Sequence, residues 1–152
     1  IGDNFLWGRD YFFVRAEFLA VKQKDTLTDI KNILLTFGGT DQHNLSLRIF
    51  NQIARLCFDK GLKIHIVTGP GYRFTDEMQE RVAGLESVTW THGTGQISRI
   101  MEKSDFAITS NGRTVYELAH MHVPAIVIAQ QVSRCHPMRL RLAFKLKNRI
   151  AH

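Results

Sequence analysis

Five short apolar runs alternate with amphipathic segments along most of this chain, and that alternation constrains its fold more than any other feature. The runs cover residues 32–37, 62–68, 87–91, 105–109 and 125–129. The first, NILLTF, is continuously apolar, as in a strand that is buried on both faces. Apolar residues recur at helical spacing in the segments between them, which predicts helices over 44–60, 75–83, 96–103 and 113–121. Strands that alternate with helices form βαβ units, so the sequence predicts an α/β fold with a parallel sheet flanked by helices on both faces.

Flanking residues indicate where some of these elements begin and end. Asn44 is placed to cap the helix over 44–60, and Gly61 is placed to end it. One more helix is expected over 137–147, with Pro137 in its first turn.

The length of 152 residues fits a single domain with a substantial core. Residues 1–31 are aromatic-rich and then polar, so we expect an N-terminal linker segment that packs on the domain formed by residues 32–152. The chain begins at Ile1 rather than Met, which suggests a piece of a longer protein. Cys57 and Cys135 lack metal-ligand spacing and fit the reducing cytoplasm, with Cys57 in the core. No apolar run approaches the roughly 20 residues that a membrane span needs.

The net charge of +6 is concentrated in residues 133–152, which carry six basic side chains and no acid. The rest of the chain is balanced, with 14 basic and 14 acidic residues. A basic amphipathic helix suits nucleic acid or a membrane surface, but a solvated helix face, or a face that docks on another part of the protein, has the same pattern. Apart from Phe144, aromatic residues are not interleaved with these charges, so we expect no nucleic-acid partner.

Four loops follow the first four apolar runs: 38–41 (GGTD), 69–71 (GPG), 92–95 (HGTG) and 110–114 (SNGRT). The carboxyl ends of parallel strands meet at one edge of a sheet, where ligands bind in such folds. Glycine-rich loops let the backbone approach a ligand closely. We therefore expect these loops to converge on one binding site.

The last of these loops has the spacing of a nucleotide site. The polar turn at 110–112 lies directly before a helix, whose N-terminus favours a phosphate or another anion, with the Thr114 hydroxyl nearby. Glu117 lies one turn further along on the same face, where a carboxylate can accept hydrogen bonds from the vicinal diol of a ribose. In the alternative interpretation, Gly112 is only a turn residue and Glu117 is a solvated acid near the start of the helix.

Histidines offer weaker signals. His92 follows a strand and His43 lies in the first loop, so either can do acid–base chemistry at neutral pH. His65 lies inside a strand, which favours a structural role. His120 and His122 have no acidic partner at metal-ligand spacing, so we predict no metal site, and we expect no cofactor.

Four stretches together resemble a known family: FGGTDQHN, GPGY, QISRIMEKSDFAI and SNGRTVYELAHMHVPAIVI. They are similar to the C-terminal, nucleotide-binding half of the UDP-sugar hydrolases of pseudaminic acid synthesis. That family is related to spore-coat polysaccharide glycosyltransferase-like proteins and to the MurG group of the GT-B superfamily. Near the N-terminus, LWGRDYFFVRAEF resembles the family's linker pattern L-G-P-x-Y-x-x-L-R-x-E-F. The motifs cover nearly all of the chain, and they are more specific for the superfamily than for a substrate.

The resemblance implies a GT-B architecture, in which two Rossmann-like domains face a cleft and the C-terminal domain binds the UDP part of a nucleotide sugar. The glycine loops would line the diphosphate. Glu117, on the helix that follows the loop at 110–114, would bind the ribose, and the loop at 91–92 would lie near the uracil. The implied substrate-binding residues are Gly38, Gly39, Thr40, Gly69, His92, Ser110, Asn111, Gly112, Thr114, Glu117 and Gln131.

The sequence departs from the family in several places. The turn reads Asn111-Gly112-Arg113-Thr114 where the family has G-G-S-T, and Arg113 adds a charge beside the expected phosphates. Arg9 and Ala16 stand where the linker pattern has prolines. The segment after residue 129 lacks the acid that the family usually carries there.

The function implied by the resemblance is binding of a UDP-2,4-diacetamido-2,4,6-trideoxyhexose-like donor for hydrolysis that releases UDP, in surface-glycan and nonulosonic acid biosynthesis. The family's N-terminal domain, which supplies the histidine that activates water, is absent from this chain. We therefore expect the donor-binding half of an enzyme, with unknown catalytic residues and no full catalysis by this half alone. The alternatives are the donor-binding half of a glycosyltransferase and a non-catalytic partner subunit.

Overall fold

Strands and helices alternate along the chain as the apolar pattern predicts. The computed structural model describes residues 13–24, 29–129 and 141–143. Its strands are β1 (Asn32–Thr36), β2 (Lys63–Thr68), β3 (Val88–His92), β4 (Phe106–Ser110), β5 (Ala125–Ile128) and β6 (Arg141–Ala143). Its helices are the 3₁₀-helix η2 (Ala16–Ala20) and α1 (Leu45–Asp59), α2 (Thr75–Val82), α3 (Ile97–Lys103) and α4 (Arg113–His120). The five strands and four helices predicted between residues 32 and 129 are confirmed, each within about two residues at either end.

The sheet has β1 near its centre, with the strand order β3-β2-β1-β4-β5-β6. Strands β1 to β5 pair in parallel, and β6 pairs antiparallel with β5. Because β1 is hydrogen-bonded to both β2 and β4, the loops that follow these three strands leave the sheet at the same edge. This is the Rossmann-like parallel sheet that the sequence predicts.

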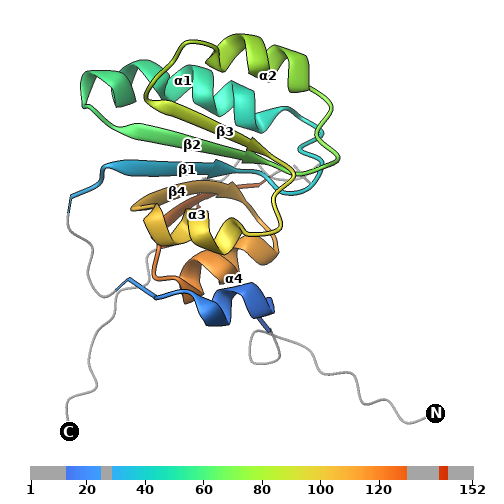
Figure 1. Ribbon diagram of the computed structural model, residues 1–152, viewed down its shortest axis with the longest axis vertical. Coiled ribbons are helices and arrows are strands. Elements are labelled where there is room, and N and C mark those ends of the chain that lie inside the picture. Colours follow the sequence, from blue (N-terminus) through green and yellow to red (C-terminus); the bar gives the residue numbers. More distant parts are fainter. Residues whose placement is uncertain (1–12, 25–28, 130–140, 144–152) are drawn as a thin grey trace, which may run out of the picture.

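Helices cover both faces of the sheet (Figure 1). Helices α1 and α2 lie on one face, where Phe50 and Met78 are fully buried against Leu35 and its neighbours. Helices α3 and α4 lie on the other face, where Met101 and Leu118 pack against the β1 residue Leu34. The alternation of Leu34 and Leu35 between two apolar clusters explains why β1 is apolar on both faces. Cys57, predicted to be a core residue, is buried in the first cluster, and burial raises the pKa of its thiol.

The segment before β1 is part of the second apolar cluster. Phe18 in η2 is fully buried, and Val21 directly follows that helix and is buried with it. Both pack with residues of α3 and α4, so η2 lies outside these helices and away from the sheet (Figure 1). Residues 13–24 are therefore held against the domain by apolar contacts.

One predicted helix is wrong where the structure describes it. Arg141–Ala143, inside the helix expected over 137–147, is strand β6. It pairs with β5, whose outer edge would otherwise present unpaired backbone groups. Pairing with the sheet edge outweighs the local helical pattern of these three residues. The rest of that predicted helix lies outside the described residues.

The N-cap predicted for α1 also differs. Asn44 has a left-handed backbone (φ 51°) and makes no side-chain cap hydrogen bond. Instead, the buried carboxylate of Asp41 accepts hydrogen bonds from the backbone N–H groups of Leu45 and Ser46, both at 2.8 Å. Asn44 uses its side chain elsewhere, because its Oδ1 accepts a hydrogen bond of 2.6 Å from the Tyr72 hydroxyl. The N-terminus of α1 is thus already occupied by a carboxylate.

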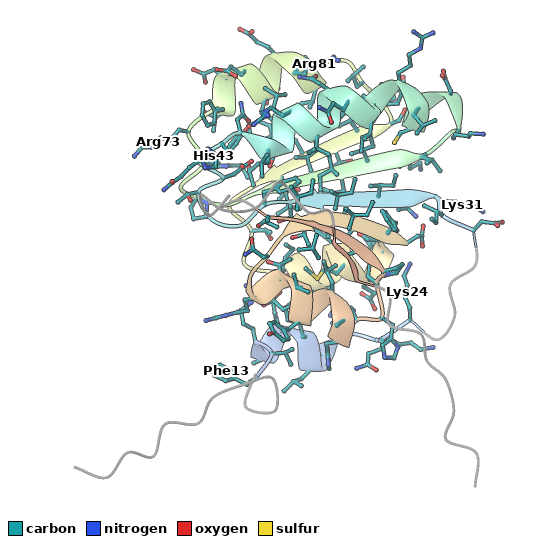
Figure 2. The ribbon with its side chains drawn as sticks, turned by 180° about the vertical axis from the view of Figure 1, so that it is seen from behind. Phe13, Lys24, Lys31, His43, Arg73 and Arg81 are labelled. Carbon is teal, nitrogen blue, oxygen red and sulfur yellow. The ribbon has the colours of Figure 1, made fainter. Side chains whose placement is uncertain are left out.

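Asp105 ties the start of β4 to the start of β1. Its Oδ2 accepts hydrogen bonds from the backbone N–H groups of Lys31 and Asn32, and Lys24 forms an ion pair with its Oδ1. Lys24 and Lys31 lie at the amino-terminal edge of the sheet, opposite the loop residues His43 and Arg73 (Figure 2). Burial acts to raise the pKa of the Asp105 carboxyl, but these hydrogen bonds outweigh it and hold the pKa below its ordinary value.

Asp105 should therefore contribute stability that depends on pH. A depressed carboxyl pKa contributes stability above the unfolded value of about 3.9, and this contribution is lost as pH falls through the folded value. We expect Asp105→Asn to lower the free energy of unfolding by about 1–3 kcal/mol at pH 7, measured by urea unfolding. The difference from the unmodified protein should shrink in acid. Asp29→Asn, at an exposed position, is the control and should change little; equal losses at pH 7 and pH 3 for Asp105→Asn would contradict this role.

Candidate functional site

An open cavity of about 360 Å³ lies at the carboxyl edge of the sheet. Its walls come from the loops after β1, β2 and β4, from the loop before α3, from the first turns of α4, and from the segment before η2. This volume is in the range of small-molecule sites. The predicted site residues that line it are Gly38, Gly39, Gly69, Ser110, Asn111, Gly112, Thr114 and Glu117.

Two glycines allow the loops after β1 and β2 to touch. A Cβ atom on Gly69 would stand 2.4 Å from the Cα of Gly39 and 2.5 Å from its carbonyl oxygen. The same carbonyl accepts a 3.0 Å hydrogen bond from the N–H of Gly71. Gly69 is therefore required for the close approach of two backbones, and that approach forms one wall of the cavity.

The N-terminus of α4 opens into this cavity without a side-chain cap. Gly112, its N-cap residue, has φ 150° and ψ −165°, a region that is essentially restricted to glycine. A Cβ atom here would meet no protein atom within 4 Å, so open space lies on that side of the backbone. Unlike α1, which Asp41 caps, α4 presents its first N–H groups and the positive end of its dipole to the cavity.

Glu117 lies in the wall of the same cavity and is 2% exposed. The structure thus contradicts the interpretation of Glu117 as a solvated acid near the helix start. Its Oε1 accepts a 2.9 Å hydrogen bond from Nε of Arg15, and the two side chains form an ion pair. A buried carboxylate needs such a partner, because burying an unpaired charge costs several kcal/mol.

Two of the predicted site residues that the structure describes, Thr40 and His92, do not line the cavity. Thr40 is exposed beside Gly71, just outside the cavity wall. His92 is exposed as well, and a 3.1 Å hydrogen bond joins its Nδ1 to the hydroxyl of the lining residue Thr68. Gln131 lies outside the described residues.

Several residues of the cavity wall were not among the predicted binding residues. Arg113, expected to add a charge beside the phosphates, lines the cavity as an exposed side chain. Arg15 lies in the stretch that resembles the linker pattern, and the charged pair R-x-E in that pattern was the available signal. The other lining residues that were not named as binding residues are Thr36, Val67, Thr68, Thr94 and Ile97, although the loop that contains Thr94 was expected at the site. Their position at strand ends and in the loop before α3 could have indicated them.

Two other histidines, His65 and His122, make hydrogen bonds within the fold. The Nε2 of His65 lies 2.8 Å from the hydroxyl of Thr91, and burial, together with the charge of Lys103, lowers the pKa of the imidazole. His122 makes a 2.9 Å hydrogen bond to the carbonyl of Lys24. Within the described part of the chain, no group of three His, Cys, Asp or Glu side chains could hold a metal ion.

None of the helices in the described residues combines the length and the apolar character that crossing a membrane requires.

Comparisons with known proteins relate the sequence of this chain to a family of domains. The sequence model of the family described as "Glycosyltransferase family 28 C-terminal domain" matches residues 33–137. An uncharacterized protein of Methanocaldococcus jannaschii is 29% identical over 134 residues, which is 83% of this chain and 27% of that protein. Spore coat polysaccharide biosynthesis protein SpsG of Bacillus subtilis is 25% identical over 124 residues, which is 81% of this chain and 37% of that protein. The chain thus spans well under half the length of either relative.

We expect the stability of the domain to depend on the backbone contact between Gly69 and Gly39. Gly69→Ala should force the two loops apart and lower the free energy of unfolding by about 1–3 kcal/mol, the usual cost of overpacking. Gly95→Ala is the matched control, because a Cβ atom there meets no protein atom within 4 Å. Thermal or urea unfolding would measure both. Equal stability of the two variants would show that the loops do not depend on this backbone contact.

Proposed function

Since the chain belongs to the family of glycosyltransferase family 28 C-terminal domains, we propose that it binds the nucleotide part of a nucleotide-sugar donor. The domain is one half of a GT-B architecture. The observation that carries the proposal is one cavity with two chemically different ends: the uncapped N-terminus of α4 at Gly112 and the buried carboxylate of Glu117. The first end suits phosphates and the second suits a sugar diol.

At the phosphate end, α4 supplies backbone donors and a side chain. Its N-cap residue, Gly112, makes no side-chain cap hydrogen bond, and the N–H groups of the first turn can donate to phosphate oxygens. The Thr114 hydroxyl lines the same wall, and Arg113 adds a full positive charge. The glycine backbone at 38–39 and 69 allows a diphosphate to approach closely. This set would hold the diphosphate without a metal ion from the protein.

At the ribose end, Glu117 is the acceptor. One helical turn separates it from Thr114, so both side chains lie on the same face of α4. An ionised carboxylate accepts hydrogen bonds from both hydroxyls of a diol, and these charge-assisted bonds are stronger than neutral ones. The ribose would thus be bound one turn along the helix from its own diphosphate.

The proposed base rests on the family resemblance, and the proposed sugar rests on that resemblance and on the Bacillus subtilis relative. We propose UDP as the nucleotide, with the uracil near the loop that follows β3, where His92 and Thr94 lie. The name of the Bacillus subtilis relative concerns spore coat polysaccharide biosynthesis, so we propose that this chain acts in the synthesis of a surface glycan. A diacetamido-trideoxyhexose donor, cleaved by hydrolysis, is the specific proposal within that class.

The reaction itself needs groups beyond this cavity. Water in a hydrolase and an acceptor hydroxyl in a transferase attack the same anomeric carbon, and no described residue of the cavity is assigned to activate either. We propose that a second domain or a partner subunit supplies this activation across the GT-B cleft. The chain would then act as the donor-binding half of an enzyme.

Calorimetric titration tests the nucleotide class. The chain should bind UDP saturably and more tightly than CDP, GDP or ADP, in a buffer without divalent cations. Glu117→Gln should weaken UDP binding by about 1–3 kcal/mol, because a neutral amide replaces the charged acceptor. Glu80→Gln, exposed on α2, is the control. Absence of saturable binding by any of the four nucleotides would refute the proposed function.

The two ends of the cavity should be separable by ligand. Arg113→Ala should weaken UDP binding by about 1–2 kcal/mol and leave uridine binding unchanged, since uridine lacks the phosphates that Arg113 faces. Glu117→Gln should weaken both ligands. Arg48→Ala removes the same charge from α1, away from the cavity, and should affect neither. A loss of uridine binding in Arg113→Ala would contradict the assignment of the phosphate end.

A further inference from the structure

One oxygen of the Glu117 carboxylate is bound by Arg15. Oε1 accepts a 2.9 Å hydrogen bond from Nε of Arg15. The side chain is 2% exposed and lines the cavity. A contact on one oxygen restricts rotation of the carboxylate, and the orientation of the other oxygen is then determined as well.

Arg15 is itself fixed from several sides. Its second contact joins Nη1 to Oε1 of Glu17 at 2.9 Å. Oε2 of Glu17 in turn accepts a 3.1 Å hydrogen bond from the backbone N–H of Ser98, in the first turn of α3. The guanidinium also lies 5.4 Å from the ring centre of the fully buried Phe18. A planar guanidinium with these contacts is pre-organised, so it can hold a second side chain in one orientation.

These contacts come from outside the βαβ framework. Arg15 precedes η2 and lies 102 positions before Glu117 in the sequence, yet it closes one side of the cavity. All three large side chains of the segment 15–18 make such contacts. Arg15 binds Glu117, Glu17 binds the start of α3, and Phe18 is buried in the core. Arg15 thus connects the segment before β1 to the proposed ribose end.

We propose that Arg15 is a positioning residue for nucleotide recognition: it holds Oε1 of Glu117 so that Oε2 faces the ribose diol. This inference rests on the proposed function and deepens it, because the segment preceding the sheet becomes part of the nucleotide site. Arg15 acts through Glu117 and does not itself bind the ligand.

Discrimination between UDP and 2′,3′-dideoxy-UDP tests this role, because the second ligand lacks both hydroxyls. The unmodified chain should bind UDP about tenfold more tightly than the dideoxy ligand, the difference expected from charge-assisted hydrogen bonds. Arg15→Ala should reduce this preference to about twofold or less, with little change in affinity for dideoxy-UDP. Arg15→Lys, which keeps the charge, should restore part of the preference. In a Glu117→Gln background, Arg15→Ala should cause no further loss of preference.

Two further variants distinguish a positioning role of Arg15 from a role in folding stability and from an effect of net charge. Arg99→Ala removes an exposed arginine that is ion-paired on α3 outside the cavity wall, and it should leave the preference unchanged. Glu17→Gln removes the charged partner of Arg15 without altering Glu117, so it should lower the preference for UDP over dideoxy-UDP. This second variant keeps the test valid if Arg15→Ala folds poorly. Thermal unfolding measures the stability of each variant.

The possible outcomes separate the two proposals. Equal weakening of UDP and dideoxy-UDP in Arg15→Ala would indicate a direct phosphate contact or a structural role, and would overturn the positioning role alone. An unchanged preference in Arg15→Ala would overturn it as well. Failure of the unmodified chain to bind UDP would refute the proposed function and this inference together.

Discussion

The site depends on the parallel hydrogen bonding of β1 to both β2 and β4. This pairing directs the loops after three strands to one edge of the sheet, although they lie far apart in the sequence. The backbone contact of Gly39 with Gly69 then joins two of these loops into one wall. Helix α4 follows the third loop, so its uncapped N-terminus faces the same space. A cavity formed in this way is an outcome of the sheet topology, and the side chains determine only its chemistry.

The chemistry of the cavity comes from contrast between two helix N-termini. The Asp41 carboxylate accepts hydrogen bonds from the first N–H groups of α1, so the positive end of that helix dipole already has an anionic partner. At α4, the N-cap residue is glycine, which makes no side-chain cap hydrogen bond, and this end of the helix lines the cavity. The acid on α4 is placed one turn further along and is neutralised by Arg15. The cavity therefore combines the N-terminus of a helix with a buried carboxylate that lies further along the same helix.

The sequence predicted those parts of the structure that rest on local patterns. Apolar runs such as NILLTF located the strands, and glycine-rich turns located the loops. Contacts between distant segments were not predictable in this way. Nothing local indicates that Arg15 pairs with Glu117, or that Asp41 rather than Asn44 caps α1. The residues Arg141–Ala143 form a strand because β5 has a free edge, a property of the folded sheet rather than of these residues.

The most direct test of a single two-ended nucleotide site is to follow backbone amide chemical shifts by NMR while UDP is added to the chain. The account predicts that the largest changes fall in the cavity wall, at residues 38–39, 69, 94–97 and 110–117, and that the dependence on UDP concentration gives one dissociation constant for all of them. Changes clustered on the outer surface of α1 and α2, or around Asp105 at the opposite edge of the sheet, would contradict it.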